Sequence, residues 1–208
     1  MKKFKLKIIT ILFGLILSND MLEFKYGLLL ESDNNPNKFI ALEDSALVHT
    51  DDGIHINFST HGYSFYIIYV TSDKEYHKFY DIHNPYSKKE LHHKTSGTFG
   101  DPPGWDILYL INSKEKLAEL ERTLKRYEKT KGTVQEKLGK KIQNILDDLS
   151  PKSKDLAYFT SRLDEPVLGG VSTRGDGDAL SRFARTHSCK GNEQVALKKI
   201  VLNHQKKQ

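Results

Sequence analysis

The only cysteine of the chain, Cys189, has a histidine, His187, two residues before it. A catalytic thiolate needs a nearby base and an oxyanion site. On a strand, residues two apart point to one face, so the two side chains could meet there. However, no orienting acid can be assigned, and a partly buried thiol is the stronger interpretation. A thiol-dependent hydrolase using Cys189 and His187 is kept as an alternative.

A second motif is the tripeptide Arg174-Gly175-Asp176, which integrins read on exposed loops. It lies in the glycine-rich stretch 172–178, which predicts an exposed loop. Because a match of three residues is common by chance, a simple turn is the stronger interpretation. Arg174 and Asp176 are nevertheless candidate binding residues, and host adhesion is another alternative.

Histidines are concentrated in the first half of the chain, where two acidic residues accompany them. They are His77, His83, His92 and His93, with Asp81 and Glu90 close by in the sequence. Imidazoles bind Zn²⁺ and Cu²⁺, but this spacing does not match the helical HExxH pattern. The sequence therefore predicts neither a metal site nor a cofactor.

The candidate that we favour for recognition is a rigid turn followed by an aromatic and an acidic residue. The turn is Pro102-Pro103-Gly104, and Trp105 and Asp106 follow it at the expected start of a strand. Loops held by a rigid scaffold often carry recognition. Trp105 and Asp106 are therefore predicted binding residues. Most aromatic residues of 63–80 are instead expected in the core.

The N-terminus combines four lysines with a short apolar run. Lys2, Lys3, Lys5 and Lys7 precede residues 8–17, which are apolar except for Thr10 and Gly14. This pattern is typical of a secretory signal peptide, and it is short for a membrane span of about 20 residues. Residues 1–18 are thus a predicted signal peptide, with uncleaved anchoring through residues 8–18 as the alternative. The expected location is periplasmic or secreted.

Charge is divided along the remainder of the chain. Residues 19–112 carry 7 Lys and no Arg against 14 acidic residues, whereas residues 113–208 carry 21 basic against 13 acidic residues. The second half could face an anionic partner, although a solvated helical face is the simpler interpretation. Export makes nucleic acid an unlikely partner, and none is predicted.

Hydrophobic periodicity predicts an α+β fold. Strands are expected at 22–30, 39–42, 54–58, 63–70, 76–82, 105–111 and 194–202, and residues 83–104 and 150–194 are expected to be mostly irregular. Two amphipathic helices should follow residue 113, the first capped by Asn112 or Ser113 and the second by Thr133 with Glu136. The prediction is a mostly antiparallel β-sheet or sandwich with a packed two-helix hairpin and a C-terminal return strand. Residues 19–208 would form one domain, with a helical insertion at about 113–149.

Three segments resemble a bacterial family of exported modules. They are the aromatic strand and turn at 63–74, the block from Pro102 to Ser113, and the tail from Val195 to His204. Together they are similar to the domain-of-unknown-function family 4384. The resemblance implies a β-rich exported module, and it brings no catalytic residue to this chain. The predicted function is an envelope-associated or secreted, non-enzymatic binding module with a protein or envelope partner.

Overall fold

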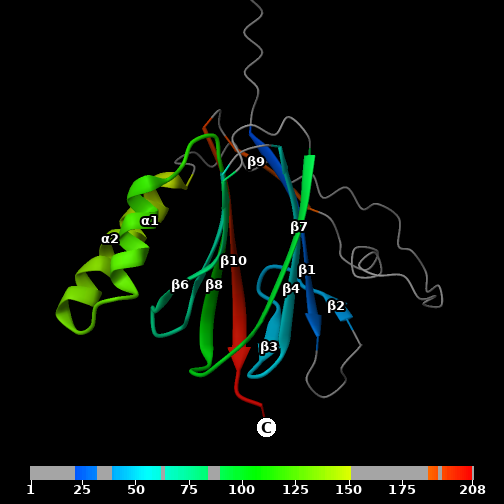
Figure 1. The fold of residues 1–208 in the computed structure, drawn as a ribbon. Coiled ribbons are helices and arrows are strands. Elements are labelled where there is room, and N and C mark those ends of the chain that lie inside the picture. The colour runs from blue at the N-terminus through cyan, green and yellow to red at the C-terminus, as the bar shows by residue number, and fades with distance from the viewer. Residues whose placement is uncertain are drawn as a thin grey trace, which may run out of the picture.

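The structure is a computed structural model that describes residues 22–31, 39–61, 64–83, 90–150, 187–191 and 194–207. The predicted signal peptide, residues 1–18, and the tripeptide Arg174-Gly175-Asp176 lie outside the described residues. Within the described residues the chain forms two β-sheets that face each other, with a helical pair beside one of them (Figure 1).

The first sheet is built around one long N-terminal strand. Strand β1 pairs on one side with β4, which pairs in turn with β7, and on its other side with β2 and β9. All these pairs are antiparallel. The strands are β1 (Glu23–Glu31), β2 (Phe39–Ala41), β4 (Gly53–His61), β7 (Glu90–Thr98) and β9 (His187–Lys190).

The second sheet has the order β3-β10-β8-β5-β6. Its pairs are antiparallel except for β3 with β10, which is parallel. The predicted return strand is therefore confirmed, and it lies inside the sheet between β3 and β8. The strands are β3 (Leu47–His49), β5 (Ser64–Val70), β6 (Tyr76–His83), β8 (Gly104–Ser113) and β10 (Val195–Gln205).

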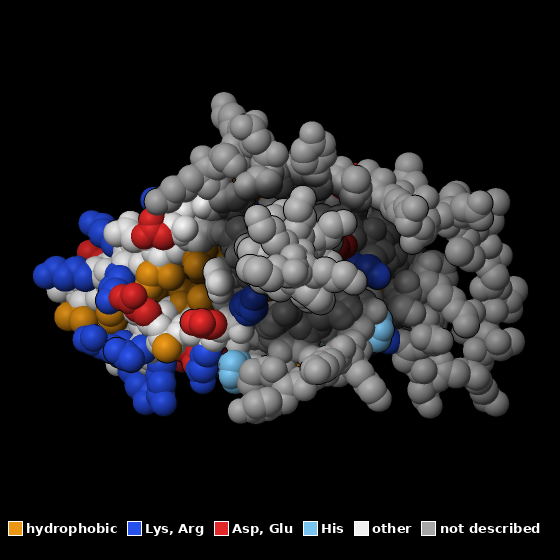
Figure 2. All heavy atoms as spheres, turned by 90° about the horizontal axis from the view of Figure 1, so that it is seen from above, with side chains coloured by type: hydrophobic (Ala, Val, Ile, Leu, Met, Phe, Trp, Pro, Cys, Tyr) orange, Lys and Arg blue, Asp and Glu red, His pale blue; other side chains and the backbone are white. Residues whose placement is uncertain are grey.

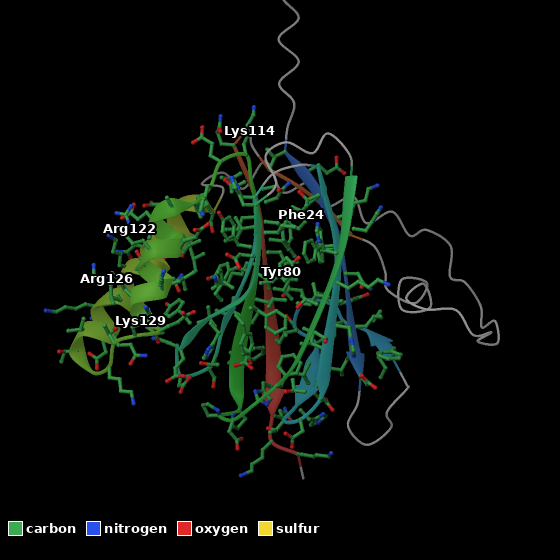
Figure 3. The ribbon with its side chains drawn as sticks, viewed as in Figure 1. Phe24, Tyr80, Lys114, Arg122, Arg126 and Lys129 are labelled. Carbon is green, nitrogen blue, oxygen red and sulfur yellow. The ribbon has the colours of Figure 1, made fainter. Side chains whose placement is uncertain are left out.

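Two hydrophobic cores hold the layers together. Between the sheets, apolar side chains of both inner faces form the larger core, in which Phe65 stacks on Phe58 with ring centroids 4.2 Å apart. Figure 3 shows Phe24 and Tyr80 pointing into this space from opposite sheets. The second core lies between the outer face of the second sheet and the helices α1 (Ala118–Tyr127) and α2 (Thr133–Leu149). The predicted α+β sandwich with a packed helical hairpin is confirmed.

Strand β5 is buried on both faces, and its sequence is therefore an almost continuous run of apolar residues. Phe65 and Ile67 face the sandwich core, whereas Tyr66 and Ile68 face the helices, and all four are fully buried. The Tyr66 hydroxyl accepts a hydrogen bond from Leu117 N at 2.9 Å and donates one to Glu121 Oε1 at 3.0 Å. Tyr66 thus fixes the start of α1 on the sheet.

Neither helix begins with the predicted side-chain cap. Asn112 and Ser113 still belong to β8, and both are buried. Asn112 accepts a hydrogen bond from Thr60 instead, and α1 starts only at Ala118 without a capping side chain. Helix α2 starts at Thr133 after Gly132, whose φ is +65°, and the predicted Thr133–Glu136 capping box is absent. Tertiary contacts have replaced the local caps.

The side chains of β6 do not alternate regularly between the two faces of the sheet. A bulge in the pairing places Tyr80 opposite Ile67 and Lys78 opposite Ile68, with Phe79 inserted between them. Tyr76 consequently packs with the helices, whereas Phe79 and Tyr80 both pack against the sandwich core. Tyr76 and Tyr80 therefore face opposite sides of the sheet although they are four residues apart, because the bulge adds one residue to the strand.

Three strands were not predicted. Strand β7 lies in the stretch 83–104 that was expected to be irregular, β9 covers part of the expected loop at 188–192, and β3 is only three residues long. Strand β7 has a polar sequence because it is an edge strand whose outward positions, such as His92 and Lys94, are exposed. Such a strand lacks the alternation of apolar and polar residues by which a half-buried strand is predicted.

Gly104 is required where the β7–β8 loop meets the β5–β6 turn. Its φ is +149°, and a Cβ at this position would lie 2.4 Å from the Ser72 Cβ. The Ser72 hydroxyl lies 3.0 and 3.1 Å from the Pro102 and Pro103 carbonyl oxygens, so the two loops are held together.

We expect Gly104→Ala to lower the free energy of unfolding by about 1–3 kcal/mol, through backbone strain and the collision with Ser72. Gly100→Ala on the same loop is the control, because a Cβ there meets no atom within 4 Å. Urea unfolding of both variants measures the effect. Equal stability of the two variants would show that the contact between the loops is not tight.

Candidate functional site

A cavity opens at the end of the sandwich where β5, β7 and β10 finish. Its volume is about 290 Å³. Apolar and aromatic side chains form most of its wall, and a few polar groups join them. The lining residues are Ile54, Tyr69, Thr71, His77, Phe79, Thr98, Phe99, Gly100, Asp101, Leu108 and Leu202.

The cavity lies at the side where β6 and β7 form the edges of their sheets. Gly97 of β7 leaves space for the Phe79 ring, since a Cβ there would lie 2.4 Å from the Phe79 Cε2 atom. His77 stands on β6 with its side chain about half exposed (52%). The cavity therefore has an apolar interior, and the polar side chain of His77 stands at its mouth.

A buried polar network lies directly behind this wall. The Tyr69 hydroxyl donates to Asp106 Oδ2 at 2.5 Å, and His204 Nδ1 lies 3.0 Å from the same oxygen. On the far side of the ring, His204 Nε2 lies 3.1 Å from Thr50 Oγ1. The side chains of Asp106 and His204 are fully buried. Tyr69 thus belongs both to the cavity wall and to a network that connects β5, β8, β10 and the turn after β3.

Burial raises the pKa of Tyr69 well above its ordinary value, and the hydrogen bond to Asp106 raises it further. The phenol therefore stays protonated and keeps its role as a donor to the carboxylate. The other oxygen of Asp106, Oδ1, has no hydrogen-bond partner among the described residues.

Thr50, His204 and Asp106 lie next to one another in space, in the order of hydroxyl, imidazole and carboxylate found in hydrolase triads. Acyl transfer also needs free donors for the oxyanion. The nearest backbone amides are occupied: Thr50 N donates to the Gln205 carbonyl and Asp51 N to the Phe99 carbonyl. The arrangement therefore supports a structural network better than a catalytic site.

The two residues predicted for binding point in opposite directions. Trp105 is 59% exposed, whereas Asp106 is fully buried. Neighbouring residues of a strand face opposite sides of the sheet, so the two residues do not form one recognition surface. Asp106 instead contributes to the network behind the cavity, a role that the sequence did not suggest.

Trp105 belongs to a row of three residues on the outer face of the second sheet, in which two large apolar side chains flank an asparagine. It lies beside Asn203 in the strand register, and Leu47 lies on the other side of Asn203. Leu47 is also exposed, at 47%. This row is a second surface candidate, separated from the cavity by the sheet itself.

The predicted histidine cluster is dispersed. His77 stands at the mouth of the cavity, and His83 contacts Ser64 at the opposite end of β6. His92 is exposed, while His93 stacks on Phe58 and has its pKa lowered by burial and by the neighbouring His92. The described ranges contain no group of three potential metal ligands brought together.

Cys189 lies on β9 and is a buried part of the sandwich core. Burial raises the pKa of its thiol to about 12, against a smaller lowering by Lys198. A thiolate is therefore strongly disfavoured at neutral pH. This environment gives no support to the thiol-dependent hydrolase.

In the part of the chain that the structure describes, no helix has the length and apolar character needed to cross a membrane. No family model, no curated protein and no solved structure matches the chain. The similarity to family 4384 therefore stays a prediction, and the arguments on function rest on the residues themselves.

Proposed function

We propose that the protein is an exported binding module that takes a small, largely apolar ligand into the cavity at the end of its sandwich. The observation that carries this proposal is the cavity of about 290 Å³, whose wall includes Tyr69, Phe79 and Phe99. Small-molecule sites are typically concave and apolar with a few placed polar groups. Export is supported by the basic start and apolar run of residues 2–17.

The chemistry of the wall defines the class of ligand. Aromatic rings and aliphatic side chains favour a flat or branched hydrocarbon group. Thr71, His77 and Asp101 at the polar part of the wall can hydrogen-bond to one polar end of it. A small aromatic molecule with one polar substituent satisfies both parts, as does the aromatic side chain of a partner protein.

A neutral fluorescent probe, 6-propionyl-2-dimethylaminonaphthalene, tests the cavity. We expect saturable binding with a blue shift, and at least a tenfold loss of affinity in His77→Trp, because the indole would narrow the mouth of the cavity at which His77 stands. A tenfold loss corresponds to about 1.4 kcal/mol. Fluorescence titration of the purified full chain gives both dissociation constants.

His92→Trp is the matched control. His92 is also an exposed histidine, but it lies on the outward face of β7 and does not line the cavity. The probe should bind this variant as it binds the natural chain. Equal affinity for the natural chain and His77→Trp would place the probe elsewhere and remove the proposal.

A further inference from the structure

The outward face of α1 carries a row of basic side chains. Arg122, Lys125, Arg126 and Lys129 are all exposed, and their spacing of three, one and three residues places them on one side of the helix. Figure 3 shows Arg122, Arg126 and Lys129 following one another along the helical hairpin, whereas Lys114 lies above the helices, in the segment that leads from β8 to α1. From Arg122 to Lys129 the row spans about 10 Å along the axis.

The acidic residues of the hairpin offset this row only in part, with Lys141 and also Arg122 lowering the pKa of Glu119 and with Glu128 lying within the row. Glu119 pairs with Lys141 at 2.8 Å, and Glu121 pairs with Lys116 at 3.1 Å. Within the described ranges, no ion pair is recorded for any of the four basic residues of the row. Between residues 114 and 141 the chain has ten Lys and Arg against five Glu. Figure 2 shows the resulting concentration of Lys and Arg at the helical end of the molecule.

The tip of the hairpin adds an apolar contact to this charge. Val134, the second residue of α2, is 49% exposed. Lys131 and Lys137, both exposed, lie on either side of it in the sequence. Basic side chains around an exposed aliphatic group are typical of surfaces that lie in the headgroup region of a membrane.

We infer that the hairpin binds the surface of an anionic phospholipid membrane through Arg122, Lys125, Arg126 and Lys129, with Val134 at the interface. An anionic lipid surface is a better partner for the basic row than nucleic acid for two reasons. The exposed residues of α1 include no aromatic side chain on which a base could stack. The same chain also begins with the basic and apolar segment that directs proteins to membranes. This inference is independent of the ligand in the cavity.

Sedimentation of the full chain with vesicles tests the inference. Vesicles of phosphatidylglycerol and phosphatidylcholine in a 1:3 ratio are compared with pure phosphatidylcholine. Each Lys or Arg close to an anionic surface contributes about fivefold to partitioning. The double variant Arg122→Gln with Arg126→Gln should therefore bind the anionic vesicles about 25-fold more weakly. Glutamine keeps the helix propensity near that of arginine.

The control removes two exposed lysines from the sandwich, Lys94→Gln with Lys206→Gln, and changes the net charge equally. It should keep the partitioning within about twofold of the natural chain, since neither residue lies on the hairpin. The N-terminal segment is present in every variant, so differences between variants report on the hairpin. Equal losses of vesicle binding in the two double variants would show that only the net charge of the protein matters. That result would overturn the inference. Retention of a 30-base-pair duplex without retention of anionic vesicles would also overturn it.

Discussion

Replacing Asp106 by alanine should lower the free energy of unfolding by about 3–5 kcal/mol, because two buried polar groups would lose their partner at about 1–3 kcal/mol each. The carboxylate is the acceptor for the Tyr69 hydroxyl and the neighbour of His204 Nδ1 at 3.0 Å. Both partners would remain buried without it. In a chain of this size each kcal/mol shifts the midpoint by about 2–4 °C, so thermal unfolding should move by at least 6 °C.

Asp101→Ala is the control for this experiment. Asp101 is exposed on the loop that precedes β8, and surface substitutions of this kind change stability by about 0.5 kcal/mol or less. Both variants are compared by denaturant unfolding followed by circular dichroism. A loss below about 1 kcal/mol in Asp106→Ala would mean that the Tyr69–Asp106–His204 network does not stabilise the fold.

Ile142→Ala should cost about 2–5 kcal/mol, the usual range for truncating a buried aliphatic side chain. Ile142 is fully buried on α2 in the core that joins the helices to the second sheet. The cavity left by the side chain should loosen the helices while the sandwich core stays intact. Hydrogen exchange should therefore accelerate more in α1 and α2 than in β1 or β4.

The matched control on the same helix is Val134→Ala. Val134 is 49% exposed, so the loss should stay within about 0.5 kcal/mol. If Ile142→Ala accelerated exchange equally in all strands, the hairpin would be part of one cooperative unit with the sandwich. If it had no effect on stability, the second core would not hold the helices.

The elements with strong hydrophobic patterns could be predicted from the sequence. The run at 63–70 indicated a strand buried on both faces, and β5 indeed has Phe65 in one core and Tyr66 in the other. The two helical stripes and the return strand were equally clear. Each of these segments shows its hydrophobic pattern within its own residues, so its structure could be predicted without knowledge of its tertiary contacts.

The features that depend on neighbours could not be predicted. Strand β7 pairs through its backbone and has a largely polar sequence, so its hydrophobicity carries no signal. The start of α1 is held by Tyr66, whose hydroxyl accepts from Leu117 N although the two residues are 51 apart in the sequence. Asp106 was predicted to bind a partner because it follows a rigid turn at the start of a strand, but the strand places its side chain inside the sandwich.

The cavity itself combines residues from six strands and the loop before β8, and no sequence motif joins them. Two local signals could have pointed to it. Gly97 in a strand can indicate that another group approaches closely, and here that group is the Phe79 ring. The Pro102-Pro103-Gly104 turn follows directly on Asp101 of the cavity wall, but the sequence suggested it as a recognition loop beside Trp105 and not as the edge of a cavity.

The most direct test of the proposed function is a methyl NMR titration of the natural chain with 6-propionyl-2-dimethylaminonaphthalene. The cavity wall contains Ile54, Leu108 and Leu202, whereas the exposed row beside Trp105 contains Leu47. The account predicts saturable shifts of the Ile54, Leu108 and Leu202 methyl groups, with Leu47 unchanged. Shifts confined to Leu47, or no saturable shift in any of the four residues, would contradict it.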